Sequence, residues 1–280
     1  MVMTLRNKVD VIIPCFNRLE LIMSSIRSVK SQTYPINKII VVDDCSSFTN
    51  EQFWMELNNN ISDSSNIEFH RKKSNGGACQ SRNQGASLSE AEFIAFLDDD
   101  DMWEPEHIEK LINCFKDDKV ALAYSGKKIT NFAKDSVRKS LNVIPNKEQY
   151  KALLKCNYPG STSSILVRKK YFLETSGFDE KLPAIQDYDF YLRLVKKGKI
   201  ATSKAYTLIY RDDTGIKITN QLNKARYAFH MIIGKTEGCF KKQLAYTIFI
   251  QNIKKAVINK NIKYALLFSL DYFKFLLMSK

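Results

Sequence analysis

The sequence predicts an α/β fold with an open, twisted, mostly parallel sheet and helices on both faces. Short apolar runs rich in Val and Ile alternate with segments whose apolar residues recur at helical spacing, through about residue 125. The expected strands are residues 9–14, 38–44, 66–70, 91–97, 120–126, 160–167 and 199–210. The expected helices are residues 20–33, 78–87, 105–116 and 187–197. Residues 131–158 have a weak, polar pattern that we interpret as loop and short helix.

The 280 residues suffice for one large α/β domain with an appendage. The net charge of +13 is concentrated near the end, because residues 215–280 carry 12 Lys or Arg against two acids. We therefore expect a main domain over residues 1–214, with halves of about 1–125 and 126–214, and a basic helical tail over 215–280. Such a tail suggests an anionic partner, either nucleic acid or a membrane surface.

The cysteine pattern and the hydropathy bear on the compartment. The six cysteines form no C-x-x-C pair, which disfavours a zinc or redox site and fits a reducing cytosol. Residues 1–14 lack the apolar core of a signal peptide, and no run of about 18 uncharged apolar residues predicts a transmembrane helix. We expect a cytoplasmic protein, which leaves contact with a membrane surface open.

The strongest chemical signal is the run of four acids from Asp98 to Asp101, directly after an expected buried strand. Adjacent carboxylates repel one another unless a cation or solvent compensates them. Hard divalent cations prefer carboxylate oxygens and often keep phosphate oxygens as further ligands. The run therefore predicts a metal–diphosphate site, and the alternative is a solvated turn that caps the helix beginning at Pro105.

Three weaker signals accompany it. Asp43 and Asp44 end another expected strand, and parallel strands end at the same edge of a sheet, where ligands bind. Gly76 and Gly77 precede an expected helix with Arg82, whose guanidinium suits phosphate. A further helix opens with Asp187, a candidate general base. The simpler interpretations are a turn acid, a plain glycine turn with a surface arginine, and a helix-capping acid.

Taken in order, the motifs resemble those of a known family. They are VDVIIPCFNR, KIIVVDDCSS, SNGGACQSRNQG, FIAFLDDDDMWEP, SGFDE and QDYDFYLRL. Their order and spacing over about residues 8–195 are similar to the family 2 inverting glycosyltransferases of the GT-A fold. Each motif is modest alone, and the six together are specific.

The resemblance implies a nucleotide-sugar site. Pro14 and its neighbours would line the base pocket, and Asp44, with Asp43 beside it, would hold the nucleobase, typically uracil. Arg82 would lie near the base or the diphosphate. Asp98 would contact the ribose region, with Asp99 able to share this work.

The resemblance also implies a metal and a base. Asp98 and Asp100 match the family's D-x-D, and Asp100 would bind Mn²⁺ or Mg²⁺ at the diphosphate, with the register uncertain by one because Asp101 extends the run. Asp187 would be the catalytic base, although Gln186 stands where the family often has Glu. A metal-neutralised nucleoside diphosphate leaves without an acid, so one carboxylate that accepts the acceptor's proton completes the chemistry.

Family and tail together imply a lipid-linked acceptor at the inner face of the plasma membrane. The expected reaction moves a hexose from a UDP-sugar, with UDP-glucose or UDP-galactose favoured, to an acceptor such as GlcNAc-diphosphoundecaprenol in O-antigen, lipopolysaccharide or capsule biosynthesis. Residues 262–278 are apolar and aromatic with lysines upstream, which favours an interfacial membrane element over helices that only pack on the main domain.

Rival functions are disfavoured by specific features. We expect no nucleic-acid partner, because no nucleic-acid module is recognisable and the basic charge lies away from the acidic motifs. A dinucleotide enzyme would need G-x-G-x-x-G after the first strand, where Pro14-Cys15-Phe16 stands instead. A sugar-phosphate nucleotidyltransferase, a transferase with another donor or acceptor, and a non-catalytic sugar-binding protein stay open.

Overall fold

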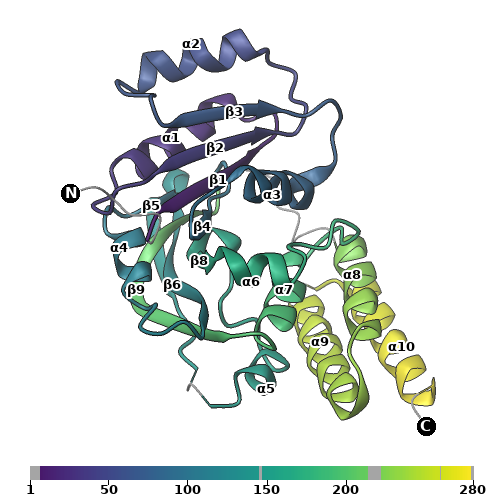
Figure 1. The fold of residues 1–280 in the computed structure, drawn as a ribbon. Helices are drawn as coiled ribbons and strands as arrows, with labels where there is room; N and C mark the ends of the chain where they lie inside the picture. Colours follow the sequence, from purple (N-terminus) through teal and green to yellow (C-terminus); the bar gives the residue numbers. More distant parts are fainter. Residues whose placement is uncertain (1–6, 145–146, 214–221, 259, 279–280) are drawn as a thin grey trace.

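The computed structural model describes residues 7–144, 147–213, 222–258 and 260–278 (Figure 1). Within them, a nine-stranded sheet has the order β3-β2-β1-β4-β8-β6-β9-β5, with β7 paired to β6. The strands are β1 (Val9–Cys15), β2 (Lys38–Asp43), β3 (Ile67–Arg71), β4 (Phe93–Phe96), β5 (Met102–Trp103), β6 (Val120–Asn131), β7 (Ser136–Ser140), β8 (Ile165–Arg168) and β9 (Lys199–Arg211). The helices are α1 (Leu19–Lys30), α2 (Asn50–Asn60), α3 (Gly77–Leu88), α4 (His107–Ile112), α5 (Gln149–Leu153), α6 (Lys169–Glu174), α7 (Gln186–Leu194), α8 (Leu222–Gly234), α9 (Gly238–Ile258) and α10 (Ile262–Met278).

The predicted α/β fold is confirmed. Strands β3, β2, β1 and β4 are mutually parallel, and β8 then joins β4 in the antiparallel direction. At the end of β1, Cys15 pairs with Asp43 of β2, and β4 ends just before the acidic run. The carboxyl ends of these strands therefore share one edge, as the motif positions predict.

Each face of the sheet carries its own hydrophobic core. Along β1, Val11 and Ile13 point into a core shared with α1, α2 and α4, whereas Ile12 points into a core shared with α3, α6 and α7. This alternation follows from the two-residue period of a strand. Figure 1 shows the helices on both sides of the sheet.

Helix α3 lies unusually close to β1 because a glycine faces the strand. A Cβ added at Gly85 would lie 2.4 Å from Cγ2 of Ile12, which is fully buried. The same helix carries Arg82 one turn earlier, so this approach fixes where the guanidinium sits.

Helix α2 is absent from the elements expected from the sequence. It begins with a capping box, in which the Thr49 side chain accepts from the Gln52 amide and the Gln52 side chain accepts from the Thr49 amide. Phe53 and Leu57, one turn apart, are fully buried against the sheet. The capping pair and the four-residue spacing were the signal available in the sequence.

The short elements β5 and α6 were also not expected, and two longer segments differ from expectation. Residues 160–167 were expected to be a strand, but a 3₁₀ turn at Thr162–Ser164 precedes β8, because the Ser164 hydroxyl donates to the Ser161 carbonyl at 2.6 Å. Residues 131–158 contain β7, which pairs with an extension of β6. Strand β7 is exposed and has no apolar alternation, so its pattern gave no strand signal.

The expected helical tail is present as α8, α9 and α10. Phe229, Leu244 and Phe249 join the same core as α6 and α7, and the Lys235 ammonium bridges Asp179 at 2.5 Å and Asp189 at 2.8 Å. The predicted boundary between residues 214 and 215 lies outside the described residues. In the described ranges, no helix combines the length and the apolar character that crossing a bilayer requires.

Replacing Gly85 with alanine tests the α3 contact. We expect Gly85→Ala to destabilise the protein by about 1–3 kcal/mol, because the new methyl overpacks a filled core. Gly234→Ala is the matched control, since a Cβ there would meet nothing within 4 Å. Urea unfolding midpoints measure both, and equal midpoints for the two variants would contradict the close approach.

Candidate active site

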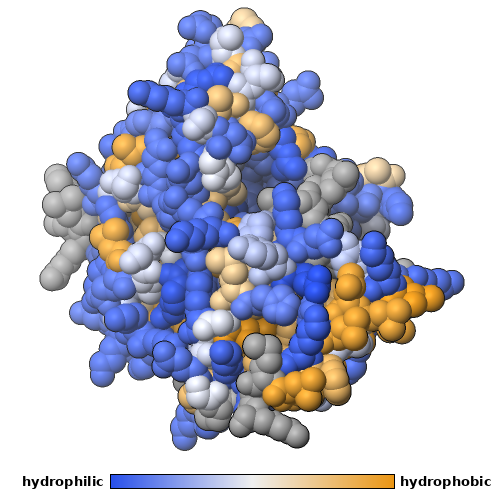
Figure 2. Space-filling model, turned by 90° about the vertical axis from the view of Figure 1, so that its right-hand side faces the viewer, coloured by the Kyte–Doolittle hydropathy of each residue, from blue (hydrophilic) through white to orange (hydrophobic). Residues whose placement is uncertain are grey.

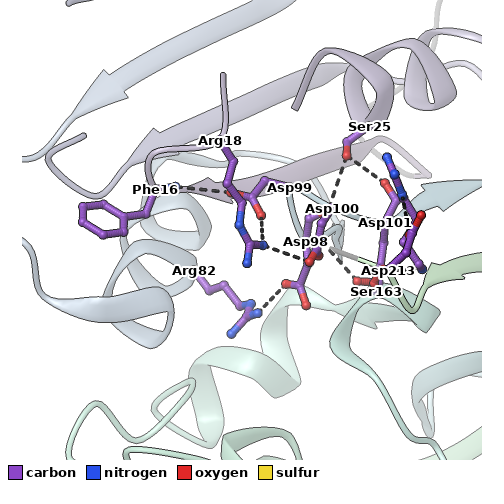
Figure 3. A network of polar contacts seen from close by, with 11 residues as sticks. Phe16, Arg18, Ser25, Arg82, Asp98, Asp99, Asp100, Asp101, Ser163 and Asp213 are labelled. Carbon is purple, nitrogen blue, oxygen red and sulfur yellow. Dashed lines mark hydrogen bonds and ion pairs between the residues drawn. The ribbon is translucent and has the colours of Figure 1, made fainter. Parts of the chain in front are cut away.

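Backbone and hydroxyl contacts fix the acidic run as a tight turn (Figure 3). The Asp101 amide donates to the Asp98 carbonyl at 3.1 Å. The Ser25 hydroxyl of α1 donates to the Asp101 carbonyl at 2.7 Å, and the Asp98 amide donates to the Ser163 hydroxyl at 3.1 Å. The four acids are thus held between the first helix and the turn before β8.

Two arginines from opposite sides offset the repulsion among these acids. Arg18 follows β1, and its Nη1 lies 2.9 Å from both Asp99 Oδ1 and Asp100 Oδ2. Arg82 of α3 donates to Asp98. Burial raises the pKa of Asp99 to about 7, although the charge of Arg18 opposes that shift. The two arginines therefore place positive charge directly beside three of the four acids.

The fourth acid, Asp101, points away from solvent. It is 1% exposed, and burial raises its pKa well above the usual value for an aspartate. The Arg211 amide donates to its Oδ1 at 3.3 Å, while Oδ2 is buried without a hydrogen-bond partner among the described residues. Asp101 therefore has a structural role, because it links the acidic turn to Arg211 at the end of β9.

The carboxylate oxygens of the acidic run suit a divalent cation whose remaining ligands come from a substrate phosphate. No group of three or more His, Cys, Asp or Glu in the described ranges is arranged to hold a metal ion by itself. Magnesium, however, is usually bound by one or two carboxylates plus substrate phosphates. Asp98 and Asp100 offer such hard oxygens, and they stay the predicted ligands of Mn²⁺ or Mg²⁺.

At the predicted base pocket, Pro14 of β1 pairs with Val42, and the exposed Phe16 follows at the strand end. Asp43 is fully buried, and both its oxygens lie 3.2 Å from the Ser46 amide. In this structure Asp43 holds the turn after β2. Its contact with a nucleobase stays a prediction.

Asp44 ties the end of β2 to the start of α3. It accepts from the Gly76 amide at 2.9 Å, from the Gly77 amide at 2.7 Å and from the Lys72 ammonium at 2.5 Å. Gly77 has a φ of +85°, a conformation that glycine adopts without strain. The glycine motif and the second acid motif thus form one unit, which the sequence did not reveal.

Asp187 lies in the first turn of α7, within range of the Arg82 charge. The Arg82 charge acts on both Asp98 and Asp187. The Asn157 amide donates to Asp187 Oδ2 at 3.2 Å. Burial of the carboxyl raises the pKa of Asp187, while its hydrogen bonds and the charges of Arg82 and Lys127 lower it in part. A partly exposed carboxylate with a raised pKa is suited to accept a proton from a substrate hydroxyl.

The structure brings the sequence-predicted residues to one edge, with Asp98, Asp99, Asp100 and Asp187 grouped around the arginines. Sequence reasoning missed the residues that support them, which are Arg18, Ser25, Lys127, Asn157 and Ser163. Arg18 was visible as the last residue of the first motif. The other four carry no functional signal of their own in the sequence, so only the folded chain identifies them.

Comparison with known proteins places the chain in a family. Residues 10–176 match the model of Glycosyl transferase family 2, so the chain belongs to that family. The fold also superimposes on a crystal structure of S. aureus TarS 1–349 in complex with UDP-GlcNAc, with a TM-score of 0.65 and 19% identity over 86% of this chain and 71% of that one. This likeness supports the GT-A fold.

Two relatives from Escherichia coli are similar over most of their length. One is the UDP-Glc:α-D-GlcNAc-diphosphoundecaprenol β-1,3-glucosyltransferase WfaP, 30% identical over 77% of this chain and 82% of that protein. The other, WcaA of strain K12, is assigned by its name to colanic acid biosynthesis and is 28% identical over 86% and 87%. Other curated relatives are longer, and the chain spans 64% of a Haemophilus influenzae glycosyltransferase and 32% of a Rickettsia felis one.

Asp44→Asn tests the link between β2 and α3. The amide keeps the shape of the carboxylate, but the buried side chain loses its charge-assisted bonds, so we expect a loss of about 1.5–3 kcal/mol in unfolding free energy. Asp118→Asn is the control, because that side chain is 92% exposed. Urea titrations measure both, and an unchanged midpoint for Asp44→Asn would mean that the loop is held by other contacts.

Proposed function

We propose that the protein is a metal-dependent inverting glycosyltransferase that moves a hexose from a UDP-sugar to a hydroxyl of a lipid-linked sugar. The observation that carries the proposal is that Arg82 donates to Asp98 of the acidic turn and that its charge also acts on Asp187. A carboxylate with a raised pKa and an acidic turn suited to a metal and a diphosphate thus share one guanidinium. Family membership supports the reaction class.

The residues divide the chemistry between two sides of the site. A divalent cation on Asp98 and Asp100 would neutralise the departing diphosphate. Arg82, whose buried Nε has no hydrogen-bond partner among the described residues, would donate to a phosphate oxygen. Pro14 and Asp44 would position the uracil end, and Asp187 would take the proton from the attacking hydroxyl. Attack from the side opposite the leaving group inverts the anomeric carbon.

The substrates named for two relatives support a choice of donor sugar and acceptor. The name of WfaP gives UDP-Glc and a GlcNAc-diphosphoundecaprenol, and TarS was crystallised with UDP-GlcNAc. We therefore favour UDP-glucose or UDP-galactose as the donor and a GlcNAc-diphospholipid as the acceptor. The product would enter O-antigen, lipopolysaccharide or capsule biosynthesis.

A lipid-linked acceptor places the reaction at a membrane, and we propose that the protein works peripherally at the inner face of the plasma membrane. Residues 215–280 carry a net charge of +10, which attracts them to an anionic lipid surface. The remainder of the chain, with a net charge of +3, contributes little to that attraction.

Release of UDP tests the proposed reaction. The assay combines a panel of UDP-sugars with Mn²⁺ or EDTA, with and without a synthetic GlcNAc-diphospholipid. We expect release with one donor that requires both the metal and the lipid. Release of pyrophosphate would indicate a nucleotidyltransferase, and no release with any UDP-sugar would contradict the proposed donor class.

The substitution Asp187→Asn tests whether Asp187 is the catalytic base. We expect transfer to fall by about 10²–10⁴-fold, because the amide cannot accept the proton, while the Kd for UDP stays nearly unchanged. Asp117→Asn, at a carboxylate exposed on the surface, is the control and should keep full activity. Loss of UDP binding in Asp187→Asn would show that this residue serves the nucleotide side instead.

The pH dependence of transfer follows from the same carboxyl. Burial disfavours the charged form and raises the pKa of Asp187, and the base works only when deprotonated. Activity should therefore be lost as the pH falls through this raised pKa, in profiles of kcat measured from about pH 5 to 8. Asp99 has a pKa of about 7 and belongs to the predicted nucleotide-binding residues, so its titration should change the Kd for UDP. Measuring this Kd over the same pH range separates the effect of Asp99 from that of Asp187. The kcat profile is extended down to about pH 4, the usual pKa of an aspartate. A kcat that stays flat over this whole range would exclude Asp187 as the base.

A further inference from the structure

Helix α10 has two opposite apolar faces, and α9 covers only one of them. Phe268 is fully buried, and Tyr264, Tyr272 and Phe275 pack partly buried beside it. The other face carries a stripe with exposed fractions between 56% and 73%, formed by Ile262, Leu266, Leu270, Phe273 and Leu277. At about 100° per residue, these positions lie within one side of the helix, opposite Phe268.

Two further apolar side chains are exposed shortly before α10 in the sequence. Val257 and Ile258, at the end of α9, are 61% and 78% exposed. Figure 2 shows apolar side chains gathered on the side of the molecule that carries the tail helices. Soluble monomers rarely expose a contiguous apolar area of this kind without a partner.

The charges around the stripe have one sign. The single acid of α10, Asp271, is 5% exposed and is neutralised by the Arg226 guanidinium at 2.6 Å and by a contact of 3.1 Å with His230. Lys263 and Lys274, by contrast, are exposed on one flank of the stripe. The outward side of α10 therefore combines apolar and positive groups, with its acid turned inward.

We propose that this stripe is the lipid-binding surface of the protein, with α10 lying in the plane of an anionic leaflet. The apolar side chains would enter the boundary between headgroups and acyl chains, and the lysines would contact anionic headgroups. A second copy of the chain would fit less well, because a two-fold contact through this stripe sets lysines beside lysines. The inference rests on the proposed function for its biological purpose, since a lipid-linked acceptor presents its sugar at such a surface.

The tail is also tied to the catalytic helix. Lys235, at the end of α8, bridges Asp179 and Asp189, and Asp189 lies two residues after Asp187 on α7. A lipid surface bound by α10 is thereby connected through packed helices to the base.

Vesicle flotation with the full chain tests the surface. The test variant is Leu266→Gln, Leu270→Gln and Phe273→Gln together. The matched control is Met55→Gln, Val137→Gln and Leu173→Gln, three side chains of similar exposure outside the tail. With vesicles of phosphatidylcholine and phosphatidylglycerol, we expect the test variant to lose at least about tenfold in partitioning, because each buried CH₂ contributes to binding. The control should float like the unmodified protein.

Several results would overturn the inference. Unmodified protein that fails to float, or a test variant that floats equally well, would exclude the stripe as a lipid-binding surface. A dimer that dissociates in the test variant, without any flotation, would make the stripe an interface between copies. Urea midpoints confirm that each variant is folded.

A soluble GlcNAc-diphosphate acceptor with a short alkyl chain separates this inference from the proposed function. The test variant should release UDP with that acceptor at the unmodified rate. If the unmodified protein floats but transfers no sugar, the lipid-binding inference holds and the proposed function is contradicted. If it transfers sugar but does not float, the proposed function holds and the lipid-binding inference is contradicted.

Discussion

Four consecutive carboxylates at the end of β4 impose the constraint on which the site depends. Positive charge from Arg18 after β1 and Arg82 on α3 offsets the repulsion among Asp98, Asp99 and Asp100, while burial raises the pKa of Asp101. Removing this charge would leave enclosed acids repelling one another. The positions of β1, β4 and α3 are therefore coupled to the chemistry of the site, and a divalent metal there would add positive charge that the bound diphosphate would offset in turn.

The parallel part of the sheet supplies the rest of the arrangement. Because β1, β2 and β4 end at one edge, the predicted base pocket, the loop tied by Asp44 and the acidic turn are neighbours. Helix α7 comes from later in the chain and brings Asp187 to the same guanidinium that holds Asp98. One arginine thus links the two halves of the proposed reaction.

Sequence patterns predicted the parallel sheet and the motif residues, since buried strands and strand-end acids depend on local composition. They did not predict the contacts that hold these residues, because Ser25 and Ser163 reach the acidic turn from segments 73 and 65 residues away. Strand β7 was also not predicted, because an exposed edge strand lacks apolar alternation. Long-range pairing of this kind is not encoded in any short window.

The central claim is that Asp98, Asp100 and Asp187 surround one nucleotide-sugar. A crystal structure with UDP and Mn²⁺ tests it most directly. The account predicts the uracil between Pro14 and Asp44, the metal on Asp100 with the diphosphate beside Arg82, and the Asp187 carboxyl on the sugar side. A diphosphate bound away from the Asp98–Asp101 turn, or a metal without contact to either Asp98 or Asp100, would contradict it.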